Sequence, residues 1–221
     1  MARKKQDPAT SGKTKNSTRK KEYGKMERFL VASKNKDKIH EIKEILEGFP
    51  FEIVGMENIG IHTDIVEDAD SFEGNALIKA TTIHNEVGGY VMADDSGLCI
   101  DALDGAPGIY SSRFCGEDST YPEKFQKIWE MLKDVPQEQW TAHFVCAIAV
   151  VRPDGSHFVV KEQCDGVLLS EPRGDNGFGY DPIFFVPEIG KTTAEISDEE
   201  KNAISHRGKA LRSMLAILKE S

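Results

Sequence analysis

Two adjacent carboxylates, Asp94 and Asp95, follow the apolar run Tyr90–Ala93 and precede Ser96 and Gly97. Because apolar residues flank this group on both sides, the sequence predicts a buried strand that ends at the two charges. Adjacent residues of a strand point to opposite faces of the sheet, so only one of the two carboxylates can lead a reaction. The alternative is that the pair forms only a turn or a helix cap after the strand.

Charged residues from distant segments could join this pair. The other candidate acids are Glu67, Asp68 and Glu73, and the candidate cations are Lys38, Lys79, Lys201, His206 and Arg207. Carboxylates are common protein ligands of Mg²⁺, and lysine and arginine side chains neutralise phosphate oxygens. The combination of both charges predicts phosphoryl chemistry.

A short basic segment, Ser33–Lys38, lies between the first predicted strand and its helix. Free backbone N–H groups and the helix dipole favour an anion at such a position, and Lys38 adds a mobile charge. The alternative for this segment is a surface loop with solvated lysines.

Motifs of several other enzyme classes are absent from the sequence. GKT occurs at 12–14 and 190–192, but a P-loop needs a glycine where this chain has Asp7 and Phe185. Neither G-x-S-x-G nor H-E-x-x-H occurs, which argues against a serine hydrolase and a zinc protease. The four cysteines contain no C-x-x-C pair, so we expect reduced thiols and no zinc site.

The elements that must position these groups follow from hydrophobic periodicity. Apolar spacing predicts helices over 36–49, 72–87, 121–132 and 198–219, and strands over 29–32, 51–56, 90–94, 141–151, 156–169 and 182–187. Arg152–Gly155 predicts the turn of a long hairpin. Helices alternate with strands before this hairpin, so the predicted fold is α/β, with a mixed, elongated central sheet, flanking helices and two lobes around an active-site cleft.

Charge divides the chain into a tail and a body. The first 28 residues contain ten Lys/Arg against three acids, whereas the remainder is strongly acidic. Residues 1–25 have almost no apolar content, so we expect a disordered basic tail and one domain over 26–221. The tail is either a solubilising extension or a nucleic-acid-binding arm. No apolar run is long enough to span a membrane and no secretory signal is present, so we expect a cytoplasmic protein without membrane contact.

Five segments together resemble the inosine triphosphate pyrophosphatase family, also called XTP/dITP diphosphatases. The segments are ASKNKDKIHEI, SFEGNALIKA, MADDSGLCIDALDGAPGIYSSRF, GFGYDPIFF and EKNAISHRGKAL, and their order and spacing match throughout residues 28–219. The resemblance implies a hydrolase of nucleotide metabolism that depends on Mg²⁺ and acts as a homodimer. It would convert non-standard purine nucleoside triphosphates (ITP, dITP, XTP) to the monophosphate and pyrophosphate, which cleanses the nucleotide pool.

The resemblance also implies roles by position. Asp95 would be the general base, Glu67 and Asp95 would hold Mg²⁺, and Asp94 would support them. The residues implied to bind the substrate are Ser33, Lys34, Asn35, Lys36, Asp37, Lys38, Lys79, Ser96, Phe178, Gly179, Tyr180, Asp181, Lys201, His206 and Arg207. The family often has Glu-Asn where this chain has Gly74-Asn75, so no carboxylate role is carried over to position 74.

We expect the residues near the C-terminal end of the chain to select the base. Donors from Lys201, His206 or Arg207 can satisfy a 6-keto oxygen but would face the amino group of adenine. Phe178 offers a stacking face for any base. Two alternatives stay open: a pyrophosphatase for damaged pyrimidines or standard triphosphates, and a catalytically silent binder of nucleotides or RNA.

Overall fold

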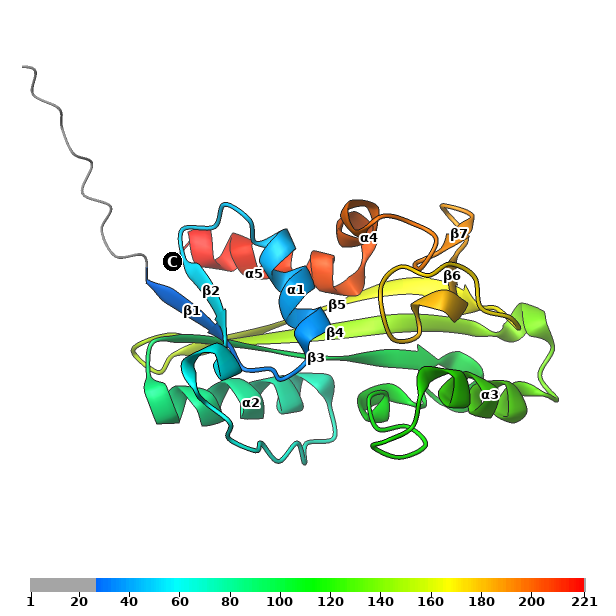
Figure 1. Cartoon of the computed structure of the whole chain (residues 1–221), viewed down its shortest axis with the longest axis horizontal. Helices are drawn as coiled ribbons and strands as arrows, with labels where there is room; N and C mark the ends of the chain where they lie inside the picture. The colour runs from blue at the N-terminus through cyan, green and yellow to red at the C-terminus, as the bar shows by residue number, and fades with distance from the viewer. Residues whose placement is uncertain (1–26, 221) are drawn as a thin grey trace, which may run out of the picture.

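A single mixed sheet runs through the computed structural model, which describes residues 27–220 (Figure 1). The predicted tail over 1–25 lies outside these residues and stays a prediction. The strand order is β2-β1-β3-β4-β5-β6-β7. The strands are β1 (Arg28–Val31), β2 (Glu52–Gly55), β3 (Tyr90–Ile100), β4 (Thr141–Val151), β5 (His157–Leu168), β6 (Phe184–Val186) and β7 (Lys191–Thr192). β1 pairs in parallel with β2 and β3 and all later pairs are antiparallel, so the predicted mixed sheet is confirmed.

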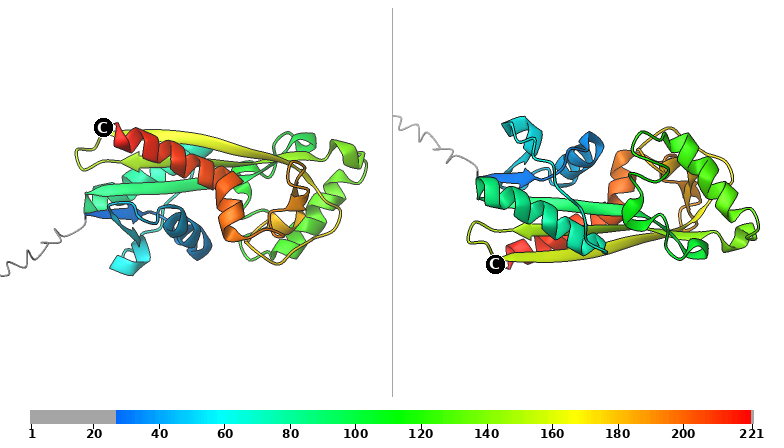
Figure 2. Two further views of the ribbon diagram at one scale, coloured as in Figure 1. Left: turned by 90° about the horizontal axis from the view of Figure 1, so that it is seen from above. Right: turned by 90° about the horizontal axis from the view of Figure 1, so that it is seen from below.

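Helices cover both faces of this sheet. They are α1 (Lys36–Ile45), α2 (Phe72–Val87), α3 (Tyr121–Leu132), α4 (Asp198–Ile204) and α5 (His206–Lys219). In Figure 1 α1, α4 and α5 lie above the long strands and α2 lies below them, and the two views of Figure 2 show α5 and α2 on opposite faces. No helix among residues 27–220 is long and apolar enough to cross a membrane.

The alternation of residues along β3 assigns each side chain to one of these faces. Val91 and Ala93 belong to the buried cluster that includes α2 residues such as Ile83, whereas Met92 belongs to the cluster that includes Met214 of α5. A third cluster, built from residues such as Leu98, Phe125, Ile128, Leu132 and Phe184, forms the core at the far end of the strands. The long strands β3, β4 and β5 therefore run through both predicted lobes (Figure 1).

The prediction that the strand ends at Asp94 and Asp95 is wrong. β3 continues to Ile100 because β4 pairs with it throughout, with Asp94 opposite Ile148 and Asp95 opposite Ala147. It is β1 that ends here, since its last pair is Val31 with Met92. The two carboxylates therefore lie in the middle of their own strand, beside the end of its neighbour.

The single helix predicted over 198–219 is also wrong. Ser205 has an extended backbone (φ −66°, ψ 157°) and separates α4 from α5. Its hydroxyl accepts a hydrogen bond from the backbone N–H of Gly208 at 3.0 Å and so caps α5. A Cβ atom at Gly208 would lie 1.9 Å from the carbonyl oxygen of Asn202, so the tight crossing of the two helices requires glycine. Another predicted helix, 36–49, ends at Ile45.

Candidate active site

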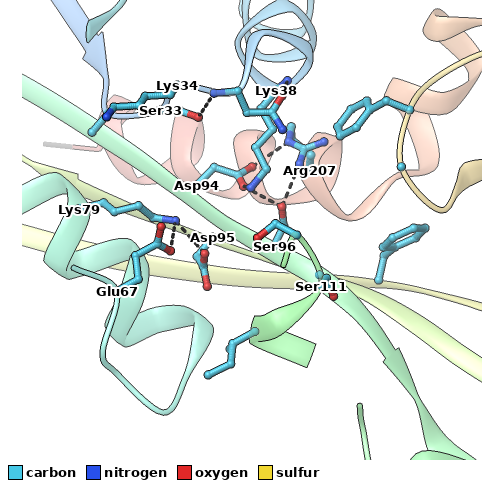
Figure 3. A pocket seen from close by; sticks show the side chains of 18 of the residues that line it. Ser33, Lys34, Lys38, Glu67, Lys79, Asp94, Asp95, Ser96, Ser111 and Arg207 are labelled. Carbon is cyan, nitrogen blue, oxygen red and sulfur yellow. Dashed lines mark hydrogen bonds and ion pairs between the residues drawn. The ribbon is translucent and has the colours of Figure 1, made fainter. Parts of the chain in front are cut away.

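A cavity of about 350 Å³ opens where β1 ends and the edge of β3 continues without it (Figure 3). Most of the predicted substrate residues line it, namely Ser33, Lys34, Asn35, Lys38, Lys79, Ser96, Phe178, Gly179, Tyr180, Asp181, Lys201, His206 and Arg207. Glu67, Asp94 and Asp95 line it as well. Segments that are far apart in the sequence, from Ala32 to Arg207, therefore line one cavity between the two lobes.

Four predicted residues do not line this cavity. Lys36 and Asp37 are exposed in the first turn of α1, because only residues three or four apart share a helix face and Lys38 occupies the face next to the cavity. Asp68 is exposed, and Glu73 forms an ion pair with Lys161.

The segment before α1 is folded by its own side chains. The Asn35 side chain accepts a hydrogen bond from the backbone N–H of Lys38 at 3.0 Å and caps the helix. The Ser33 hydroxyl accepts one from the backbone N–H of Asn35 at 3.1 Å. This turn places the α1 N-terminus and the Lys38 side chain beside the cavity, which is a favourable place for an anion.

Asp94 points to the α5 face, where basic and hydroxyl groups surround it (Figure 3). Its Oδ1 lies 2.6 Å from Lys38 Nζ and 2.8 Å from the Ser96 hydroxyl, and its Oδ2 lies 2.7 Å from Arg207 Nε. Burial alone would raise the pKa of Asp94, but the charges of Arg207 and Lys38 hold this pKa well below its usual value. Asp94 is therefore an ionised group with both oxygens occupied, which suits it to hold its neighbours in place.

Asp95 points to the opposite face, toward α2 (Figure 3). Lys79 Nζ donates to Asp95 Oδ1 at 2.7 Å and to Glu67 Oε2 at 2.9 Å. The second oxygen of Asp95, Oδ2, is buried and has no hydrogen-bond partner among the described residues. Burial raises the pKa of Asp95, and the nearby Glu67 charge raises it further, although Lys79 opposes both effects. Asp95 thus combines a raised proton affinity with a free oxygen.

Glu41, a buried acid that the sequence did not predict, joins two of the cations that line the cavity. It forms ion pairs with Arg207 and, at 2.7 Å, with Lys201 Nζ. Lys201 also lies 2.5 Å from Asp181 Oδ2. Burial opposes the charge of Glu41, but Arg207 and Lys201 outweigh it and lower the pKa of Glu41. The one sequence signal was its position three residues after Lys38, on the same helix face.

The Phe178 ring lies against this charged group. Lys201 Nζ is 4.9 Å and Arg207 Cζ is 5.6 Å from the ring centroid. The backbone N–H of Phe178 donates to Asp181 Oδ2 at 2.8 Å. Gly177 permits this turn, because its φ is +72° and a Cβ there would lie 2.2 Å from the same oxygen. The cavity therefore offers an aromatic face beside two cations, which suits a flat, polar ring.

His206 is buried and stacks on Phe144, with 4.8 Å between ring centroids and 13° between planes. Burial and the charge of Arg207 lower the pKa of His206 well below its usual value. The imidazole is therefore neutral at pH 7, so one ring nitrogen donates and the other accepts.

The carboxyl groups of Glu67 and Asp95 fit a divalent cation. Both contact the same ammonium group, since Lys79 Nζ lies 2.7 Å from Asp95 Oδ1 and 2.9 Å from Glu67 Oε2, and the unpartnered Asp95 Oδ2 is available to a ligand. The described residues contain no cluster of three or more His, Cys, Asp or Glu side chains placed for a metal. Mg²⁺ commonly uses one or two carboxylates and takes its other ligands from water and phosphate oxygens, so this pair matches that ion.

Comparison with known proteins gives a consistent picture. Residues 29–217 match the Ham1 family. A dITP/XTP pyrophosphatase of Geobacter sulfurreducens is 46% identical over 195 residues, which cover 88% of this chain and 96% of that protein. A dITP/XTP pyrophosphatase of Bacillus cereus is 42% identical over 191 residues, covering 86% and 93%. Among solved structures, a HAM1 protein from Coxiella burnetii superimposes with a TM-score of 0.80 at 39% identity, covering 89% of this chain and 100% of that one.

Proposed function

Because the chain belongs to the Ham1 family, we propose that its cavity binds a non-standard purine nucleoside triphosphate such as ITP, dITP or XTP. The enzyme hydrolyses this substrate to the nucleoside monophosphate and pyrophosphate. One observation carries the proposal: the adjacent carboxylates are divided between the two sheet faces. Asp94 is held by cations beside the aromatic pocket, and Asp95 keeps a free oxygen beside Glu67. Relatives more than 40% identical to this chain are named dITP/XTP pyrophosphatases.

The triphosphate lies near the α1 N-terminus, between Lys38 and Lys79. These lysines approach β3 from opposite faces of the sheet, since Lys38 Nζ contacts Asp94 and Lys79 Nζ contacts Asp95, and both line the cavity. Burial opposes the charge of Lys79, but Asp95 and Glu67 outweigh it and raise the pKa of Lys79, so the side chain stays cationic. Two fixed ammonium groups and a helix N-terminus neutralise phosphate oxygens and hold the chain of phosphates in place.

Hydrolysis requires a water molecule to attack the α-phosphorus. Asp95 accepts a proton from this water, the new bond forms between its oxygen and phosphorus, and the bond from the α-phosphorus to the bridging oxygen breaks. Pyrophosphate leaves with that bridging oxygen. Both oxygens of Asp94 are occupied by Lys38, Ser96 and Arg207, whereas Asp95 Oδ2 has no partner among the described residues, so the geometry favours Asp95 for this role.

We propose that Glu67 and Asp95 hold Mg²⁺. When bound, Mg²⁺ supplies positive charge that polarises the phosphate oxygens. The protein contributes the two carboxylates, and Lys79 keeps them close together while they are both ionised.

Selectivity for the base arises on the α5 face. The Lys201, Arg207 and neutral His206 side chains carry N–H donors that match a 6-keto oxygen, and Phe178 stacks on the ring. Adenine presents an amino group at this position, so its binding would leave a buried donor facing another donor. The homodimer stays a proposal that rests on the family resemblance, and the cytoplasmic location stays a proposal that rests on the sequence.

A substrate panel tests the function. The full chain is incubated with ITP, dITP, XTP, GTP, ATP and dUTP, with Mg²⁺ and with EDTA, and pyrophosphate and orthophosphate are measured separately. We expect pyrophosphate without orthophosphate, faster turnover of ITP than of ATP, and loss of activity in EDTA. Orthophosphate as the main product, or faster turnover of ATP or dUTP, would contradict the proposal. No turnover of any substrate would favour a silent binder.

A further inference from the structure

The segment that carries Glu67 has no regular secondary structure from Ile61 to Ala69, so no strand or helix of its own fixes the position of this carboxylate. Its closest backbone anchor is two residues away. The backbone N–H of Ala69 donates to the Asn75 side-chain oxygen at 3.1 Å. Asn75 lies in the first turns of α2 and is fully buried.

Gly74 allows the helix to touch this segment directly. A Cβ atom at position 74 would lie 2.6 Å from the Ala69 Cβ and 3.0 Å from the Ser71 hydroxyl. Its φ is not in the left-handed region, so the only cost of a side chain here is space. In this chain, where the Ala69 methyl group stands at that contact, a Cβ atom at position 74 would force Ala69 to shift away from α2.

The same helix, α2, also carries Lys79, which binds both carboxylates. Lys79 lies four residues after Asn75, on the same face of α2, and its ammonium bridges Glu67 and Asp95. The Asn75 amide nitrogen is buried and has no hydrogen-bond partner in the described part of the chain. A buried unpaired donor lowers stability, so stability alone does not account for an asparagine at this place.

We propose that Gly74 and Asn75 are positioning residues that hold Glu67 beside Asp95 for cation binding. This inference rests on the proposed function of Glu67. Without the Asn75 amide, or with a methyl group at 74, the segment around Ala69 moves and the two carboxylates no longer act together. The aromatic pocket on the opposite face of the sheet is unaffected.

Titration of the full chain with Mn²⁺ tests this inference without turnover. Free Mn²⁺ is measured by electron paramagnetic resonance in the presence of an ITP analogue with a methylene group between the α- and β-phosphates. Asn75→Ala and Gly74→Ala should each weaken Mn²⁺ binding about tenfold or more, as losses around metal ligands commonly do. The matched control is Asn85→Ala, an exposed asparagine of the same helix, which should stay within twofold of the unchanged chain.

Two further measurements keep the test decisive. Affinity for the analogue without metal should be unchanged in all variants, because their base pocket is intact. Gly74→Ala retains every hydrogen-bonding group and ordinarily favours a helix, so it carries the test if Asn75→Ala unfolds.

Glu67→Gln is measured in parallel. If Glu67→Gln weakens Mn²⁺ binding but the other two variants do not, the positioning role is refuted and the proposed function stands. If Glu67→Gln has no effect, the proposed cation site itself is wrong.

Discussion

Replacing each of the adjacent carboxylates by asparagine should separate stability from catalysis. Both changes keep the side-chain shape and remove one negative charge. In Asp94→Asn the removed charge faces Lys38 and Arg207, and Arg207 is 2% exposed, so the change leaves a buried guanidinium paired with Glu41 alone. Breaking a buried ion pair in this way costs about 3–5 kcal/mol. For a chain of this size the melting temperature falls by roughly 6–20 °C.

The expected effect of Asp95→Asn on stability has the opposite sign. The pKa of Asp95 is raised by folding above its unfolded value, so its contribution to stability is present at low pH and is lost as the pH rises. At pH 7 the ionised carboxylate therefore opposes folding, and asparagine should leave the free energy of unfolding unchanged or increased. Asparagine cannot accept a proton from water, so kcat should fall by about a hundredfold or more.

Urea unfolding followed by circular dichroism gives the free energy, and pyrophosphate release from ITP at saturating Mg²⁺ gives kcat. A destabilised Asp94→Asn and a stable, inactive Asp95→Asn are expected. If Asp95→Asn retains more than a tenth of the unchanged kcat, the base is another group, with Glu67 next in line. If Asp94→Asn unfolds at the same urea concentration as the unchanged chain, the ion pairs around Asp94 do not stabilise the fold.

Three further predictions concern the surroundings of this pair. Lys34 Nζ lies 2.5 Å from an oxygen of Asp64, whose side chain is 95% exposed. Asp64→Asn should free Lys34 to bind phosphate and so lower the KM for ITP by about 1.5- to 5-fold at low salt. The KM values of the variant and the unchanged chain should be equal at high salt, where exposed charges are screened. The pKa of His206 is lowered on folding, so the free energy of unfolding should fall as the pH drops below about 6.5, by up to ~1.4 kcal/mol per pH unit. Urea midpoints between pH 7 and 5 should lose this slope in His206→Phe, which keeps the stack on Phe144. Arg207→Ala should lower the ITP-to-ATP ratio of kcat/KM by roughly ten- to a hundredfold. This ratio does not depend on the fraction of the variant that is folded. An unchanged ratio would exclude Arg207 from base recognition.

The parts of the site that depend on local pattern could be predicted from the sequence. The division of Asp94 and Asp95 between opposite faces follows from strand alternation alone, and the cap formed by Asn35 follows from its place before a helix. The end of the strand could not be predicted, because Asp-Asp-Ser-Gly is typical of a turn and only pairing with β4 keeps it extended.

Long-range pairing explains the other failures. Glu41 meets Lys201 and Arg207, which lie 160 and 166 residues further along the chain, so no local pattern marked it as part of the site. Apolar spacing continues smoothly through Ser205, and only the tight crossing at Gly208 shows that the helix is interrupted there. Local periodicity thus predicted the elements, whereas the contacts between them decided where each one ends.

The open edge of β3 has a consequence for how the protein behaves at high concentration. At the end of β1, the last contact with this edge is the hydrogen bond that the Met92 carbonyl accepts from the Ala32 N–H. Within residues 27–220 no strand covers the edge from there to Leu98, whose backbone N–H donates to the Ser111 hydroxyl. Uncovered strand edges can recruit a strand of another molecule and start aggregation, and charged side chains at the edge prevent this. We therefore expect the carboxylates and lysines of the cavity to oppose such pairing between copies of the protein. Neutralising Asp94 and Asp95 together should make the chain aggregate during refolding, even where each single variant refolds cleanly.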